Sequence, residues 1–214
     1  MKKVIIPAII AKNQQELETS LQRVHRYVEI IQLDIMDGKF VQNTSLNFDF
    51  TLPTTSCHFE AHLMIEDPLT WITKYSSKVD TILVHYESCS HLDEVIDHVR
   101  EQKKRVGLVL NPDTPLKKIE SYLSSLDQVL LMTVHPGFYG SKFLPEILKK
   151  IAQLRQMKPS YNIEVDGGIT DKTITLVDKA GANMFVSGSY IVKASNVQDS
   201  IETLRKLLAI SDTK

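Results

Sequence analysis

The feature that most constrains the fold of this chain is a regular alternation of short apolar runs with longer segments of helical spacing. Each run is rich in Val, Ile or Leu and ends at a polar or glycine-bearing loop. The eight runs are Val4–Ile10, Ile30–Met36, Phe59–Ile65, Thr81–Tyr86, Val106–Leu110, Val129–Val134, Ile163–Val165 and Met184–Val186. Short, nearly continuous apolar runs are typical of strands that are buried on both faces, as in a parallel sheet.

Helix-boundary signals occupy the stretches between the runs. Asn13 followed by Glu16 resembles a capping box, Pro68 and Pro115 suit a first helical turn, and Gly181 is typical of a C-cap. Eight strand–helix units in 214 residues leave about 27 residues each, which is the size of a compact (β/α)8 barrel. A doubly wound open sheet normally has fewer strands at this length. We predict an α/β protein, with a single (β/α)8 TIM barrel domain over residues 1–214.

The charge balance bears on possible partners. The chain has 25 Lys and Arg against 26 Asp and Glu, a net charge of −1, which argues against a nucleic-acid or membrane-surface partner. No apolar run approaches the roughly 18 residues of a membrane span, and the N-terminal apolar stretch is too short for a secretion signal. Cys57 and Cys89 form neither a metal spacing nor a disulfide framework. We expect a cytoplasmic protein that binds neither nucleic acid nor membrane.

Ionisable residues fall where the barrel hypothesis places chemistry, at the C-terminal ends of strands. Side chains alternate along a strand, so residues two apart share a face. Such sets are Gln32, Asp34 and Met36, then Glu60, His62 and Met64, then Glu164 and Asp166. If these faces point inward, Asp34, His62 and Asp166 converge at the barrel mouth, where a divalent cation would offset the cost of confining two acids. Each aspartate alone is more typical of a turn or a helix cap, but three such strand ends together are unusual.

Glycine-bearing loops follow the last strands. Gly167 and Gly168 come after the seventh strand, and Gly188 and Ser189 after the eighth. Glycine lets a backbone N–H group approach an anion closely, and barrels often bind phosphate with these two loops. The four residues are therefore candidates for a phosphate site, although an isolated glycine more often serves only a tight turn.

Several segments together resemble the ribulose-phosphate 3-epimerases and their hexulose-phosphate relatives. They are Leu33–Val41, Ala61–Met64, Leu110–Pro115, Met132–Phe138 and Glu164–Gly168. The resemblance implies a barrel of the ribulose-phosphate-binding type that inverts C3 of a ketose phosphate, as in D-ribulose 5-phosphate to D-xylulose 5-phosphate. In such enzymes one carboxylate removes the C3 proton, and a second returns a proton to the opposite face of a metal-stabilised enediolate. These catalytic positions correspond to Asp34 and Asp166.

The same resemblance assigns further roles by position. The divalent metal, whether zinc, iron, manganese or magnesium, would be held by Asp34, His62 and Asp166. A methionine cap beside the enediolate maps to Met36, Met64 and Met132. The phosphate-binding backbone maps to Gly137, Phe138, Tyr139, Gly140, Gly167, Gly168, Gly188 and Ser189. Relatives are commonly dimers or hexamers, so a homo-oligomer is expected.

Two departures from the family pattern bear on activity. Gln32 stands where the family has its first metal-binding histidine, and Ala8 stands where a serine usually hydrogen-bonds substrate. An amide oxygen is a harder and weaker ligand than imidazole, so the site keeps its metal with help from Gln32, prefers a harder ion, or has lost it. Loss of the metal would leave a non-catalytic sugar-phosphate-binding barrel. A sugar-phosphate decarboxylase is discounted, because Met36 occupies the position of its lysine.

Overall fold

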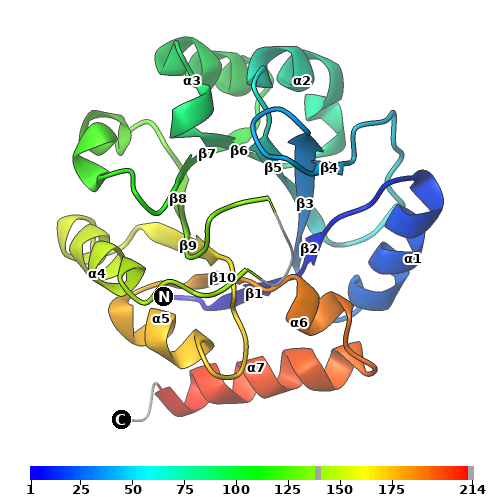
Figure 1. Cartoon of the computed structure of the whole chain (residues 1–214), viewed down its shortest axis with the longest axis vertical. Coiled ribbons are helices and arrows are strands. Elements are labelled where there is room, and N and C mark those ends of the chain that lie inside the picture. The colour runs from blue at the N-terminus through cyan, green and yellow to red at the C-terminus, as the bar shows by residue number, and fades with distance from the viewer. Residues whose placement is uncertain (138–140, 212–214) are drawn as a thin grey trace.

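One closed parallel sheet forms the centre of the protein, as seen in a computed structural model that describes residues 1–137 and 141–211 (Figure 1). Its strands follow the order β1-β10-β9-β8-β7-β6-β5-β3-β2. They are β1 (Val4–Ile6), β2 (Ala8–Ile9), β3 (Ile30–Asp37), β5 (His58–Met64), β6 (Thr81–His85), β7 (Arg105–Leu110), β8 (Gln128–Met132), β9 (Asn162–Asp166) and β10 (Met184–Val186). The predicted (β/α)8 barrel is therefore confirmed, with small shifts at the strand ends.

The first apolar run closes the barrel. Pro7, which has no backbone N–H group, divides this run into β1 and β2. Val4 of β1 pairs with Met184 of β10, whereas Ala8 of β2 pairs with Gln32 of β3. The same short stretch thus contacts both neighbouring strands, and the parallel sheet has no free edge.

Helices surround the ring of strands (Figure 1). They are α1 (Gln14–Val24), α2 (Pro68–Tyr75), α3 (Leu92–Glu101), α4 (Ile147–Met157), α5 (Ile174–Ala180), α6 (Ser189–Val192) and α7 (Val197–Ser211). The expected boundary signals at Asn13, Pro68 and Gly181 act as predicted. Asn13 Oδ1 accepts from the Glu16 N–H at 2.9 Å, Pro68 lies in the first turn of α2, and Gly181 ends α5 at φ 113°.

The segment after Pro115 does not form the α-helix that its pattern predicts. It makes two 3-10 turns, Leu116–Lys118 and Glu120–Tyr122. The preceding carbonyl groups are held by Lys150, whose Nζ donates to Asn111 O at 3.2 Å and Thr114 O at 2.7 Å. These contacts hold the loop against α4, and the chain continues to β8 through the two 3-10 turns.

The long connection after β3 folds over the barrel mouth. Its β4 (Thr44–Ser45) pairs antiparallel with the end of β3, and Phe50 is fully buried beneath it. Asp37 accepts from the backbone N–H groups of Lys39 and Phe40 at 2.8 and 3.0 Å. These contacts fix the chain just beyond the carboxyl end of β3.

The molecule has an apolar layer between strands and helices, but its barrel interior is partly polar. The polar residues that are at most 1% exposed on the interior strands include Gln32, Glu60, His62, Gln128 and Glu164. Such residues are seldom buried unless they are paired or functional. Within the described residues, no helix is long and apolar enough to cross a membrane.

The loop that follows β9 depends on Gly167. Its φ is 118°, and a Cβ there would lie 2.4 Å from a methyl carbon of Val134. We expect Gly167→Ala to lower the free energy of unfolding by about 2–4 kcal/mol, because backbone strain and overpacking add. Urea unfolding of Gly167→Ala, Val134→Ala and the double variant measures this. The two losses should be less than additive, and full additivity would contradict the contact.

Candidate active site

A pocket opens at the carboxyl ends of the strands. The residues that line it come from the barrel mouth and from the loops beyond β8, β9 and β10. Asp34, His62 and Asp166 lie in it, with side chains that are 9%, 0% and 14% exposed. The barrel therefore brings together the three residues that the sequence placed at its mouth.

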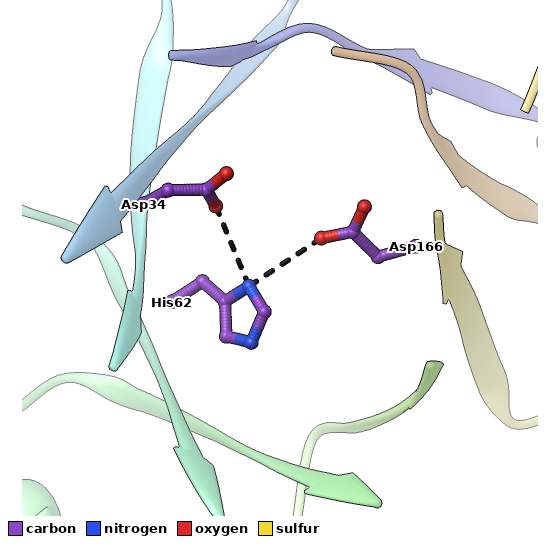
Figure 2. A group of neighbouring side chains, drawn as sticks. All are labelled: Asp34, His62 and Asp166. Atoms are coloured by element: carbon purple, nitrogen blue, oxygen red, sulfur yellow. Dashed lines mark ion pairs between the residues drawn. The ribbon is translucent and has the colours of Figure 1, made fainter. Parts of the chain in front are cut away.

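The three side chains point toward one another (Figure 2). Asp34 on β3 is in register with His62 on β5, and Asp166 ends β9 on another side of the barrel. His62 Nδ1 lies 3.4 Å from Asp34 Oδ1 and 3.4 Å from Asp166 Oδ2. Asp166 is held in place because its carbonyl oxygen accepts from the Thr133 N–H at 2.7 Å. One imidazole nitrogen thus faces a carboxylate on each side.

Gln32 lies beneath this group and is fully buried. Its Nε2 donates to Asp34 Oδ1 at 2.8 Å and to Asp166 Oδ2 at 2.8 Å. The same nitrogen lies 3.3 Å from His62 Nδ1. The amide group therefore links the two carboxylates.

The environment shifts the protonation of these groups. Burial raises the pKa of Asp34, although its hydrogen bond with His62 opposes the shift. Burial alone would lower the pKa of His62, but hydrogen bonds with Asp166 and Asp34 and their negative charge raise it to about 9. The two neighbouring carboxyl groups therefore favour the protonated form of the His62 imidazole.

A second histidine supports the first. His62 Nε2 lies 2.9 Å from His85 Nε2, and His85 Nδ1 lies 3.3 Å from Glu87 Oε2. Burial lowers the pKa of His85 to about 4, so this ring is neutral near pH 7. A neutral His85 that donates from Nδ1 to Glu87 can accept at Nε2 from His62. This arrangement fixes the ring of His62 and leaves its Nδ1 directed at the carboxylates.

A layer of buried polar side chains lies below the site. Gln128 Nε2 donates to Glu164 Oε2 at 2.5 Å and to Glu60 Oε2 at 3.4 Å. Burial raises the pKa of Glu60 to about 7, partly opposed by hydrogen bonds with Glu164 and Gln128. Burial and the nearby charge of Glu60 raise the pKa of Glu164. The two glutamates therefore retain protons at pH values at which exposed carboxyl groups have lost them.

The donor set fits a divalent cation. One ligand atom from each of Asp34, His62 and Asp166 lies within 4.8 Å of the other two. Two carboxylate oxygens and one imidazole nitrogen, with an open side toward the pocket, are typical of a catalytic rather than a structural metal site. These three residues form a possible metal site, and the donor set alone does not select one ion.

The other predicted site residues also gather at the pocket. Ala8, the three methionines Met36, Met64 and Met132, and the loop residues Gly137, Gly167, Gly168, Gly188 and Ser189 all line it. Phe138, Tyr139 and Gly140 lie outside the described residues. The structure thus brings the described candidates together, whereas their individual roles stay predictions.

Some residues of the site were missed by sequence reasoning. His85 directly contacts His62, and no role in the site was assigned to it from the sequence. The sequence feature that could have indicated this position is its place at the end of an apolar run, where strand alternation puts His85 on the same face as Leu83 and Thr81. Gln128 was not singled out because it precedes an apolar run and resembles an ordinary polar boundary residue. Thr170, which also lines the pocket, carries no distinctive pattern.

A parallel barrel with two carboxylates and an imidazole at its mouth defines a barrel enzyme suited to acid–base chemistry. The sequence model of the ribulose-phosphate 3 epimerase family matches residues 4–192. The ribulose-phosphate 3-epimerase of Bacillus subtilis is 37% identical over 211 residues, covering 94% of this chain and 97% of that protein. Its counterpart from Synechocystis is 36% identical, covering 94% and 93%. The chain therefore belongs to the ribulose-phosphate 3-epimerase family.

Solved structures of low sequence identity support the fold. The 3-keto-L-gulonate-6-phosphate decarboxylase of Vibrio cholerae superposes with a TM-score of 0.73 at 13% identity, covering 98% of this chain and 99% of that one. A 3-hexulose-6-phosphate synthase gives a TM-score of 0.68 at 16% identity, covering 96% and 99%. The family match confirms the predicted enzyme class, an isomerase of the epimerase type, and does not favour a non-catalytic barrel.

The raised pKa of Glu60 gives a pH-dependent stability. A carboxyl group whose pKa is about 7 in the fold and near 4.5 when unfolded stabilises the fold at low pH. This contribution is complete below pH 4.5 and is lost as the pH rises through 7, by about 3 kcal/mol in total. In Glu60→Gln we expect the free energy of unfolding to lack this decline between pH 4.5 and pH 8. Urea unfolding of chelator-treated protein measures it.

The matched control is Glu94→Gln on exposed α3, which should keep the pH profile of the unchanged protein. Parallel profiles for Glu60→Gln and the unchanged protein would contradict the assignment.

Proposed function

We propose that this protein inverts the configuration at C3 of a ketose phosphate, with D-ribulose 5-phosphate and D-xylulose 5-phosphate as the pair. The observation that carries the proposal is the placement of Asp34 and Asp166 on two sides of one imidazole, both in the floor of a single pocket. Inversion without a redox cofactor needs two proton-transfer groups on opposite faces of a planar intermediate. The two carboxyl groups meet that need.

Asp34 and Asp166 would act in turn. In one direction Asp34 takes the C3 proton, and Asp166 delivers a proton to the opposite face of the enediolate; in the other direction they exchange roles. The raised pKa of Asp34 suits this work, because a proton carrier is most effective when its pKa approaches the working pH. Met36, Met64 and Met132 present apolar, polarisable groups beside the flat intermediate and keep water from it.

Asp34, His62 and Asp166, with Gln32 as a further candidate, would hold a divalent cation: zinc, iron, manganese or magnesium. When bound there, the cation would act as a Lewis acid that lowers the cost of charge on the substrate oxygens. His85 and Glu87 would keep His62 oriented for this task through the contact between His62 Nε2 and His85 Nε2.

The phosphate end of the substrate would lie against the glycine loops. Gly137, Gly167 and Gly168 have positive φ values of 112°, 118° and 65°. Such conformations turn backbone N–H groups toward a common concave surface, which suits an anion. Gly188 and Ser189 add the start of α6, whose first N–H groups have no partner within that helix. Phe138, Tyr139 and Gly140 complete the predicted set.

Hydrogen exchange at C3 tests the proposal. Ribulose 5-phosphate in D2O with added Mn²⁺, Zn²⁺ or Fe²⁺ should gain deuterium at C3 in the presence of the protein. Asp34→Asn and Asp166→Asn should each lower the epimerisation rate by about 10²–10⁴-fold, because an amide cannot carry the proton. Proton NMR of the substrate measures the exchange, and a coupled assay measures the rate.

Asp97→Asn on the exposed face of α3 is the matched control and should keep full activity. The same assay with hexulose phosphates decides the chain length of the substrate. If no pentulose or hexulose phosphate exchanges at C3 with any of these ions, the proposal fails. Activity that appears only in Gln32→His would instead favour the sugar-phosphate binder.

Assembly and location stay predictions. Homo-oligomer formation is checked by light scattering of the purified protein during gel filtration, where a monomer mass would contradict it. Fractionation of the cells that make the protein checks the expected cytoplasmic location.

A further inference from the structure

The two ends of the Gln32 amide have unlike surroundings. Nε2 donates at 2.8 Å to both Asp34 and Asp166, whereas Oε1 is buried and has no hydrogen-bond partner among the described residues. Buried carbonyl oxygens nearly always have a partner, so this oxygen calls for an explanation. Gln32 is fully buried and does not line the pocket, so bulk water does not reach it from that side.

The amide nitrogen and the three candidate ligand atoms are the corners of one compact group of four atoms. The other three corners are Asp34 Oδ1, Asp166 Oδ2 and His62 Nδ1, at 2.8, 2.8 and 3.3 Å from Nε2. His62 Nδ1 is 3.4 Å from each carboxylate oxygen. Four ligands at about 2.0–2.1 Å from one ion would be about 3.3 Å apart, which is close to these separations. An amide N–H₂ group cannot bind a cation, but an amide oxygen at the same corner can.

Oxygen atoms without hydrogen-bond partners lie in the layer next to Gln32 along the sheet. Gln32 is the register partner of Glu60 on the neighbouring strand. In the layer of Glu60, Gln128 and Glu164, each side chain has an Oε1 atom without a hydrogen-bond partner in the described part of the chain. A half-turn of the Gln32 amide would bring its N–H₂ group to this side and its oxygen to the cation corner.

We infer that Gln32 coordinates the divalent cation through Oε1 and that its amide turns over when the cation binds. Without the ion, Nε2 holds the two carboxylates together; with the ion, Oε1 replaces it and N–H₂ turns toward the Glu60 layer. The inference rests on the proposed function only in that it assumes a cation at Asp34, His62 and Asp166. The resulting ligands are three oxygens and one nitrogen, a harder set than one with a second imidazole. The site thereby favours Mn²⁺ over Zn²⁺ more than a site with histidine at position 32.

Metal titration of chelator-treated full-length protein tests the ligand role. Calorimetry with Mn²⁺ alone and Zn²⁺ alone is compared for the unchanged protein, Gln32→His, Gln32→Leu and Gln32→Glu. Gln32→His should shift the ratio of Zn²⁺ to Mn²⁺ affinity toward Zn²⁺ by 10-fold or more, and Gln32→Leu should weaken Mn²⁺ binding by 10-fold or more. Gln32→Glu, of the same shape, should bind Mn²⁺ at least as tightly as the unchanged protein. Glu94→Gln on the exposed face of α3, away from the site, should change neither affinity by more than about 3-fold.

Side-chain amide NMR tests the turnover directly. In protein with ¹⁵N-labelled glutamine, the Gln32 side-chain signal is identified by its absence from the Gln32→Glu spectrum. Saturation with Zn²⁺ should move that signal well beyond the shift of the Gln128 signal. An unmoved Gln32 signal at saturation, Mn²⁺ binding by Gln32→Leu as tight as by the unchanged protein, or no cation binding at all would overturn the inference. C3 exchange by the unchanged protein, measured separately, shows whether the epimerase proposal survives such a result.

Discussion

Closure of the parallel sheet by residues 4–9 is the constraint on which the rest of the structure depends. Pro7 lets one short run pair with β10 on one side and β3 on the other. With no open edge, the inward faces of the strands must share one narrow interior. Gln32 and Asp166, 134 positions apart in the chain, therefore come within hydrogen-bond distance. The geometry of the site is a consequence of this closure rather than of any local motif.

The same closure forces polar side chains into the barrel interior, where their burial costs free energy. Gln32, Glu60, His62, Gln128 and Glu164 are almost completely removed from water, and several of their oxygens have no hydrogen-bond partner within residues 1–137 and 141–211. An apolar interior of equal volume would be more stable, because unpaired buried polar groups lose hydration without full compensation. The protein limits this cost by keeping protons on the buried glutamates and by placing donors such as Gln128 between them. The buried polar layer of Glu60, Gln128 and Glu164 thus lowers the stability of the fold, and it lies directly below the site.

The sequence alone predicted the barrel and the meeting of Asp34, His62 and Asp166, since strand alternation and the carboxyl-end rule depend only on spacing. It could not predict the contact of His85 with His62, because an inward histidine in an apolar run looks like any buried one. The contacts of Gln32 could not be predicted from the sequence either. Its departure from the family pattern was visible in the sequence, but the bond of its amide to both carboxylates depends on side-chain torsions and on the register with β5. The segment after Pro115 forms 3-10 turns in place of the predicted helix, and the loop before it is bonded to Lys150 of α4, a tertiary contact that local pattern does not encode.

The near-neutral charge of the chain is compatible with a doubly anionic ligand because of how this pocket is built. Among the described residues that line it there is neither lysine nor arginine. In the proposed phosphate site the donors are backbone N–H groups at Gly137, Gly167, Gly168 and Gly188, which do not enter a count of charged side chains. At the other end of the pocket, a divalent cation would balance Asp34 and Asp166, which together contribute two of the 26 acidic residues. A net charge of −1 therefore argues against an extended surface for a polyanion, but it carries no information about a small anion held by the backbone.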